Sequence, residues 1–122
     1  MSTSNNLLII EDRKNTAKMM KLTLERIFPQ AGAIEIALSA PEAVAKMETQ
    51  KYGAAISDGL NGAWKEVYKK GTEKNPKMYF LLVSGDWQER ESAEGLNIPT
   101  LDKPVSIEQL EGAITKYLGM RK

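Results

Sequence analysis

Four short apolar segments of this chain are each followed by side chains that can bind a metal ion or a phosphoryl group. The segments are residues 7–10, 54–57, 79–83 and 98–101, and the side chains that follow them are Glu11 with Asp12, Asp58, Ser84 and Lys103. The carboxyl ends of parallel strands meet at one edge of an open α/β sheet, where ligands bind. Three carboxylates, a hydroxyl and an ammonium group at such an edge would suit a divalent cation and a phosphoryl group.

The composition narrows the chemistry to oxygen ligands. The chain has 122 residues and contains neither cysteine nor histidine. Disulfides, thiolate catalysis, metal sites built on Cys or His, and a Ser-His-Asp triad are therefore excluded. A site made only of oxygen atoms favours Mg²⁺, with Mn²⁺ or Ca²⁺ as alternatives.

The charge balance and the hydropathy pattern bear on partners and location. The 17 basic and 16 acidic residues give a net charge of +1, which offers no reason to expect binding to nucleic acid or to a membrane surface. No apolar segment approaches the roughly 20 residues of a membrane span. The polar N-terminus, residues 1–6, lacks the basic start of a signal peptide. We therefore expect one cytoplasmic domain.

Segments with strand character alternate with segments that have helical periodicity. The expected strands are residues 7–10, 34–38, 54–57, 78–83 and 98–101, and the expected helices lie near residues 17–27, 39–50, 64–68, 88–93 and 106–119. Strands separated by helices imply right-handed crossovers and a parallel sheet that is covered on both faces. At this length the pattern predicts an α/β fold, namely a doubly wound flavodoxin-like (βα)5 domain with a five-stranded parallel sheet.

Particular residues are expected to set the ends and the buried faces of the helices. Residues 39–42 and 106–109 are capping-box patterns, each a serine followed three residues later by Glu or Gln. Gly71, Asn75 and Pro76 are expected to break the chain after a short third helix, and Gly119 is expected to end the last helix. The residues expected to pack in the interior include Trp64, Trp87, Ile107, Leu110, Ile114 and Tyr117.

The polar positions together resemble the receiver domain of two-component response regulators. The motifs that carry the resemblance are, in order, Ile10-Glu11-Asp12, Ser57-Asp58, Val83-Ser84-Gly85 and Asp102-Lys103-Pro104. Each motif alone is a weak signal, but all four in order, each at the end of a strand, are much more specific. The resemblance covers residues 7–118 and implies a single CheY-like receiver domain over residues 1–122.

The resemblance implies roles in phosphoryl transfer. Asp58 resembles the phosphoacceptor of the family. Ser84 matches the hydroxyl residue that follows the phosphoryl group on activation, and Lys103 matches the lysine that pairs with it. Pro104 matches the proline after this lysine, which often follows a cis bond. Asp58, Ser84 and Lys103 are therefore the expected catalytic residues.

The resemblance also implies a metal site. Asp12 resembles the direct ligand of Mg²⁺, and Glu11 the acid that acts through metal-bound water. Asp58 would be a further ligand, and the backbone carbonyl of Leu60, two residues later, would complete the site. Clustered carboxylates repel one another, and a bound cation relieves that repulsion.

The function implied is that of a phosphoacceptor rather than a dedicated enzyme. A histidine kinase or a histidine phosphotransfer protein would donate the phosphoryl group to Asp58 with Mg²⁺ bound. Only a few residues follow Tyr117, so we expect no output domain unless the sequence is part of a longer protein. The effect is therefore expected to pass to a downstream protein target or along a phosphorelay.

Three departures from the family pattern affect what we expect of signalling. The loop formed by residues 59–61 is shorter than usual, and the segment between Ser84 and Lys103 is also short, which implies a stunted fourth helix. Thr100 occupies the position of the usual switch aromatic, three residues before the lysine. We therefore expect phosphorylation to change residues 84–89 more than the surface around Thr100.

Each motif also has a purely local interpretation. An acidic pair such as Glu11-Asp12 is favoured at a helix N-terminus by the helix dipole. Asp58 before Gly59 suits a turn, and a proline such as Pro104 suits a helix start. Asp86 fits equally well as an N-cap or as a position that affects dephosphorylation in receivers.

Two other functions remain open at this stage. The short loop after Asp58 and the threonine at position 100 favour a receiver-like interaction module that is not phosphorylated. An aspartyl phosphatase of the haloacid dehalogenase type needs a second Asp two residues after the first, and this chain has Leu60 there. The chain is also short for the cap of such enzymes, which disfavours this alternative.

Overall fold

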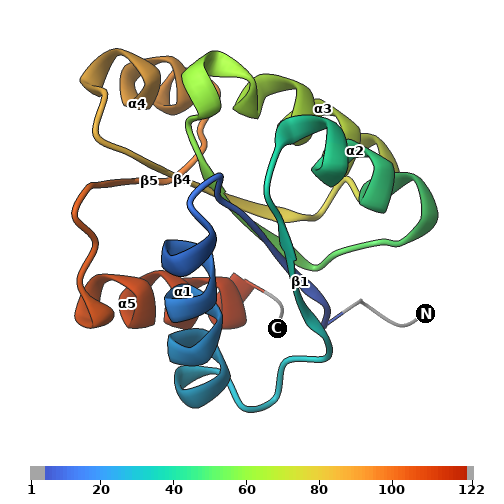
Figure 1. Cartoon of the computed structure of the whole chain (residues 1–122), viewed down its shortest axis with the longest axis vertical. Helices are drawn as coiled ribbons and strands as arrows, with labels where there is room; N and C mark the ends of the chain where they lie inside the picture. Colours follow the sequence, from blue (N-terminus) through green and yellow to red (C-terminus); the bar gives the residue numbers. More distant parts are fainter. Residues whose placement is uncertain (1–4, 121–122) are drawn as a thin grey trace.

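Five parallel strands form one sheet, and five α-helices connect and cover them (Figure 1). This computed structural model describes the backbone of residues 5–120 and the side chains of residues 5–117. The strands are β1 Leu7–Ile10, β2 Ile34–Ala37, β3 Ala54–Asp58, β4 Tyr79–Ser84 and β5 Thr100–Asp102. The helices are α1 Lys14–Ile27, α2 Ala40–Thr49, α3 Trp64–Lys74, α4 Trp87–Glu94 and α5 Ile107–Met120, with a 3-10 turn, η1, at Leu60–Gly62.

The strand order is that of a doubly wound sheet. The strands lie in the order β2-β1-β3-β4-β5, and every neighbouring pair is parallel. Helices α1 and α5 lie side by side on one face, and α2, α3 and α4 cover the other (Figure 1). The predicted flavodoxin-like (βα)5 fold is confirmed. Within the described residues, no helix is long and apolar enough to cross a membrane.

The sheet has an apolar layer on each face, because alternate side chains of a strand point to opposite faces. On the face of α1 and α5, Leu7 and Ile9 pack with residues of both helices, such as Leu24 and Ile114. On the opposite face, Leu8 and Ile10 join the side chains of α2, α3 and α4. Every residue of β1 is therefore fully buried, which explains why its sequence is apolar throughout.

The register of the strands aligns their carboxyl ends. Ile10 pairs with Ser57, and Ser84 pairs with Asp102 at the other side of the sheet. The residues that follow β1 and β5, and the last residues of β3 and β4, therefore lie along one edge. This edge is where the sequence predicted the polar side chains to meet.

Serine caps begin two of the helices as predicted. Ser39 Oγ accepts a hydrogen bond from Glu42 N at 3.2 Å. The Glu42 carboxylate accepts from Leu38 N, one residue before the expected partner. At α5 the exchange is reciprocal, since Ser106 Oγ accepts from Gln109 N and Gln109 Oε1 accepts from Ser106 N.

Of the three residues expected to break the chain after the third helix, Asn75 and Pro76 follow its end, but Gly71 lies inside it. Helix α3 runs to Lys74, three residues past that glycine. A Cβ at Gly71 would collide with the end of the Met78 side chain and lie 3.1 Å from Met47 Cε. Gly71 therefore permits close packing between α3, α2 and the start of β4, and it does not break the chain.

Four expectations about individual residues and the ends of elements were wrong. Trp64 is fully buried as expected, but the Trp87 side chain is 61% exposed at the start of α4. Ile107 is 59% exposed, so the buried face of α5 begins at Leu110. Helix α5 also continues through Gly119 to Met120. Strand β5 begins at residue 100 rather than 98.

Candidate functional site

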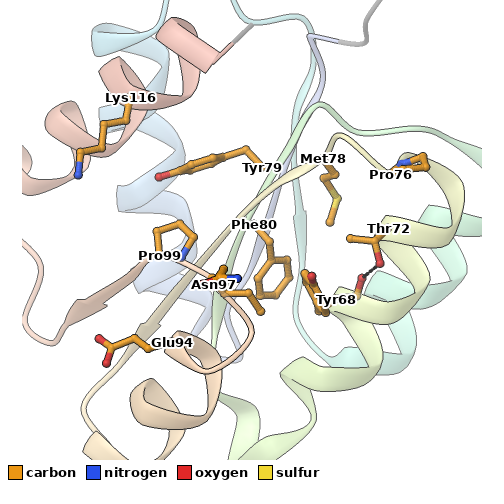
Figure 2. A pocket seen from close by; sticks show the side chains of 11 residues that line it. Tyr68, Thr72, Pro76, Met78, Tyr79, Phe80, Glu94, Asn97, Pro99 and Lys116 are labelled. Atoms are coloured by element: carbon orange, nitrogen blue, oxygen red, sulfur yellow. Dashed lines mark hydrogen bonds between the residues drawn. The ribbon is translucent and has the colours of Figure 1, made fainter.

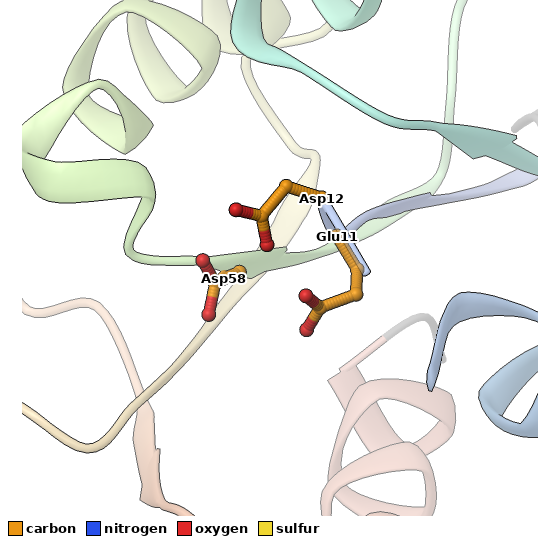
Figure 3. Close-up of side chains that lie close together, drawn as sticks. All are labelled: Glu11, Asp12 and Asp58. Atoms are coloured by element: carbon orange, nitrogen blue, oxygen red, sulfur yellow. The ribbon is translucent and has the colours of Figure 1, made fainter. Parts of the chain in front are cut away.

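Three carboxylates meet at the carboxyl edge of the sheet (Figure 3). Glu11 and Asp12 follow β1, and Asp58 is the last residue of β3. One oxygen from each carboxylate lies within 4.8 Å of the others. Glu11 is 2% exposed, Asp58 is half-buried and Asp12 is exposed, so the cluster opens to solvent on the side of Asp12. The cluster predicted from the sequence is therefore brought together by the fold.

Lys103 supplies the positive charge of this cluster. It follows β5 and precedes Pro104 through a cis peptide bond. Its Nζ donates to Asp58 Oδ1 and, at 3.2 Å, to Glu11 Oε1. The remaining oxygens of these carboxylates accept from the backbone, with Leu60 N 3.0 Å from Asp58 Oδ2 and Arg13 N 3.0 Å from Glu11 Oε2. Both carboxylates are thus held in fixed orientations.

The environment shifts the protonation equilibria of two of these groups. Burial raises the pKa of the Glu11 carboxyl, and the neighbouring Asp12 and Asp58 carboxyls raise it further. The hydrogen bond from Arg13 N and the charge of Lys103 oppose this shift without cancelling it. Burial alone lowers the pKa of Lys103, but the contacts with Asp58 and Glu11 outweigh it and the net shift is upward. The site therefore holds a lysinium ion beside a carboxylate that is costly to ionise.

We expect Glu11→Gln to stabilise the metal-free protein at pH 7. The folded pKa of Glu11 lies above its ordinary value of 4.5, so the folded state binds its proton more tightly than the unfolded state does. The ionised Glu11 carboxylate therefore destabilises the folded protein at neutral pH. This effect disappears as the pH falls through the raised pKa towards 4.5. Urea unfolding in EDTA at several pH values measures this. A stability gain that stays constant from pH 7 to the acid limit would contradict it.

The turn after Asp58 is tight and strained. Leu60 and Asn61 have φ of 51° and 54°, and Gly62 has φ of 92°. Left-handed backbone costs a residue such as leucine about 1–2 kcal/mol. The Leu60 carbonyl accepts from Ala63 N at 3.1 Å within η1. Its role as a metal ligand stays a prediction.

The Ser84 hydroxyl is held by a residue that the sequence analysis did not select. Ser84 Oγ donates to Glu89 Oε1 at 2.7 Å and accepts from Asp86 N at 3.0 Å. Glu89 Oε2 accepts from Gly62 N at 2.7 Å. The signal available in the sequence was the spacing of Asp86 and Glu89, which matches a helix cap followed three residues later by glutamate. Asp86 does cap α4, through Gln88 N.

Two concavities lie on the surface near the ends of the sheet. A cleft of about 570 Å³ between α1 and the start of α5 is lined by Glu11 and Lys103, together with Met19, Met20 and Ile107. A second concavity, of about 470 Å³, lies at the opposite end of β4 and is shown in Figure 2. Its lining includes Tyr68, Phe80 and Pro99 and is mainly apolar. Of these two concavities, the first adjoins the acidic cluster, because Glu11 lines it.

Comparisons with known proteins find similar structures but no similar family model or curated protein. A scan against protein-family models and a search of curated proteins both find no match for this chain. Among solved structures, a CheY-like response regulator receiver domain protein from Methanospirillum hungatei has a TM-score of 0.80 at 24% identity, covering 98% of each chain. The signal receiver domain of a DNA-binding response regulator from Colwellia psychrerythraea has a TM-score of 0.79 at 25% identity, over 93% of this chain and 98% of that one. This chain has the receiver-domain fold.

Receiver folds occur in proteins of differing function. The chain is also similar to a structure of adenylate cyclase from Rhodopirellula baltica, with a TM-score of 0.78 and 21% identity over 96% of this chain and 89% of that one. At such identities the likeness shows the fold, and the function must be argued from the site.

Proposed function

We propose that this chain is the phosphoacceptor receiver domain of a two-component phosphorelay, with a domain core at residues 7–118. Asp58 would accept a phosphoryl group from a phosphohistidine of a cytoplasmic histidine kinase or histidine phosphotransfer protein. A downstream protein would then read the phosphorylated state. The observation that carries the proposal is the contact of the Asp58 carboxylate with the Lys103 ammonium, beside the carboxylates of Glu11 and Asp12.

The transfer requires a nucleophile that is fixed in place and a cation for the transferred group. An Asp58 oxygen would use a lone pair to form an O–P bond while the P–N bond of the phosphoimidazole breaks. The electrons of that bond stay on the ring, which leaves as neutral imidazole because its other nitrogen carries the proton. The hydrogen bond from Leu60 N orients Asp58, and Lys103 would neutralise charge on the transferred oxygens.

The acidic cluster fits Mg²⁺. Its donors are all carboxylate oxygens, which this ion prefers, and one oxygen from each of the three side chains lies within 4.8 Å of the others. Burial and, to a lesser extent, the neighbouring carboxylates raise the pKa of Glu11, so a bound cation would relieve part of the cost of its negative charge. When bound, the ion would stabilise negative charge on the phosphoryl oxygens. Glu11, Asp12 and Asp58 would hold it, and Mn²⁺ would fit the same donor set.

The surface beside the cluster suits a protein donor. Met19 and Ile107 are 65% and 59% exposed, and both line the cleft that contains Glu11 and Lys103. Exposed apolar side chains of this size around a polar centre are typical of a binding face. A phosphohistidine carried on a protein surface could therefore dock here and reach Asp58.

We expect Asp12→Asn to abolish the response of the protein to millimolar Mg²⁺. Asp12 is the most exposed of the three acids, and within the described residues it is the one that Lys103 does not contact, so its charge can be met by a cation. Tryptophan fluorescence reports binding, because Trp87 follows Asp86, whose amide binds the Ser84 hydroxyl at the same edge of the sheet. Glu108→Gln, which removes an exposed charge on α5, is the control. Identical titration curves for wild type and Asp12→Asn would remove Asp12 from the metal site.

The proposed function is tested by intact-mass spectrometry after incubation with acetyl phosphate and Mg²⁺. We expect the mass of one phosphoryl group on wild type and on Glu108→Gln, and none on Asp58→Asn. Omitting Mg²⁺ should strongly slow the labelling. Wild-type protein that binds Mg²⁺ but is never labelled by a small donor or by phosphoramidate would overturn the proposal.

A second candidate function is that of a receiver-like interaction module that is not phosphorylated. The observation that favours it is the engagement of the Ser84 hydroxyl by Glu89 beside a strained turn. In that case folded wild-type protein would stay unlabelled, and Asp58→Asn would bind the partner as well as wild type does.

A further inference from the structure

We propose that the Glu89 carboxylate occupies the place of an anion in the phosphoryl site and gates phosphorylation of Asp58. The inference rests on the proposed function and names a regulatory residue of the same site. We define the Glu89 bridge as the two hydrogen bonds that this carboxylate accepts, from Ser84 Oγ and from Gly62 N, each at 2.7 Å.

The bridge commits the one proton of the Ser84 hydroxyl. A serine hydroxyl donates a single hydrogen bond, and here it goes to Glu89. The same oxygen accepts from Asp86 N. A phosphoryl group on Asp58 that is to receive a hydrogen bond from Ser84 must therefore replace Glu89 as the acceptor.

The carboxylate also lies against the backbone that follows the phosphoacceptor. Gly59 is buried, and a Cβ at this position would overlap the Glu89 carboxylate. The short turn at residues 59–62 thus leaves a space beside Asp58 that a side chain from α4 fills. A negative charge already sits where the phosphoryl charge would develop, and like charges at short range oppose each other.

The bridge is more than a local helix cap. In a capping box, the glutamate three residues after the cap returns to the amide of the cap residue. Here the Asp86 amide is taken by Ser84, and Glu89 instead reaches across 27 residues of sequence to Gly62. It therefore joins α4 to the turn after β3, on the two sides of the site.

Loss of the Glu89 bridge is expected to change only a small part of the structure. The neighbouring Arg90 donates to the Ser84 carbonyl at 2.6 Å and to Asp102 Oδ1 at 3.0 Å, which ties α4 to the ends of β4 and β5. When Glu89 leaves, these bonds still hold the helix. Phosphorylation would then release the turn at residues 59–62 and the Glu89 side chain. A partner would recognise this local change, because Thr100 cannot act as the aromatic switch.

Two variants open the bridge in different ways. Glu89→Gln removes the charge and keeps the shape of the side chain. Gly59→Ala keeps the charge and displaces the carboxylate, and its backbone, with φ −67° and ψ −31°, accepts alanine without strain. Glu91→Gln is the matched control, because it removes an exposed charge from the same helix.

The first measurement is the affinity for beryllofluoride, a stand-in for the phosphoryl group, with Mg²⁺ present. Because a hydrogen bond to a charged group contributes about 1.5–3 kcal/mol, we expect at least about tenfold tighter binding by Glu89→Gln. Gly59→Ala places its methyl group in the space that the carboxylate leaves, so its affinity should rise less than that of Glu89→Gln. Glu91→Gln should bind as wild type does. Equal affinity of all four proteins for beryllofluoride would overturn the proposal that Glu89 gates phosphorylation. The proposed function would still stand in that case, because the wild-type protein binds beryllofluoride.

The second measurement is the exchange rate of the Gly62 amide hydrogen in wild-type protein, followed by NMR. We expect beryllofluoride to accelerate this exchange, and we expect Glu89→Gln to show faster exchange before any is added. An unchanged exchange rate of the Gly62 amide in protein saturated with beryllofluoride would overturn the gating role of Glu89 and leave the proposed function intact. Failure of wild type and of both variants to bind beryllofluoride would overturn the proposed function and the gate together.

Discussion

Replacement of Lys103 by alanine is expected to slow phosphorylation of Asp58 by about 10²–10³-fold, the usual cost of losing one positioned donor to developing negative charge. Lys103 Nζ contacts both Asp58 and the buried Glu11, so it is already placed where the phosphoryl oxygens would gather. The rate of labelling by acetyl phosphate at saturating Mg²⁺ measures the effect. Lys18→Ala, which removes an exposed lysine on α1, is the control.

The same substitution should also affect stability in a metal-dependent way. Glu11 is 2% exposed in the wild-type protein, and without Lys103 it would face two carboxylates and lose its contact with a cation. The variant should be less stable than wild type in EDTA, and added Mg²⁺ should restore more stability to it than to wild type. Labelling of Lys103→Ala at the wild-type rate would show that the lysine is a structural partner of Asp58 and takes no part in transfer.

Trp64→Ala is expected to have the largest effect on stability, a loss of about 3–5 kcal/mol. Trp64 is fully buried at the start of α3, and its ring centre lies 6.3 Å from that of Phe80. It also begins the helix that follows the strained turn, so the cavity would open directly behind the site. Urea unfolding measures the loss, and a total stability of about 5–15 kcal/mol means that this variant could be largely unfolded on warming.

Two matched variants make this prediction specific. Trp87→Ala removes a ring that is 61% exposed, and its effect should stay within about 0.5 kcal/mol. Trp64→Phe should cost much less than Trp64→Ala, because Trp64 Nε1 has no hydrogen-bond partner within the described part of the chain. Equal losses for Trp64→Ala and Trp87→Ala would contradict the packing described for α3.

The sheet and the acidic cluster could be predicted from the sequence because they depend on local patterns. A strand buried on both faces must be apolar throughout, and Leu7–Ile10 meets that condition. Parallel strands then place whatever follows them at one edge, so the meeting of Glu11, Asp58 and Lys103 follows from topology.

The features that were missed depend on tertiary contacts. Gly71 appears as a helix breaker in sequence, but the nearby Met78 and Met47 side chains need the space that it leaves. Trp87 appears as a core residue, but the short helix α4 turns it to solvent. Glu89 finds its partner Gly62 only after the chain has folded, because 27 residues separate the two.

The most direct test of the central claim is to locate the phosphoryl group. Protein labelled with acetyl phosphate and Mg²⁺ is treated with borohydride, which cleaves an acyl phosphate reductively, and is then mapped by peptide mass spectrometry. We predict a single modified residue, Asp58, whose label is lost in alkali. A label at Ser84 or at another carboxylate, or a bond that survives alkali, would contradict the assignment of Asp58 as the phosphoacceptor.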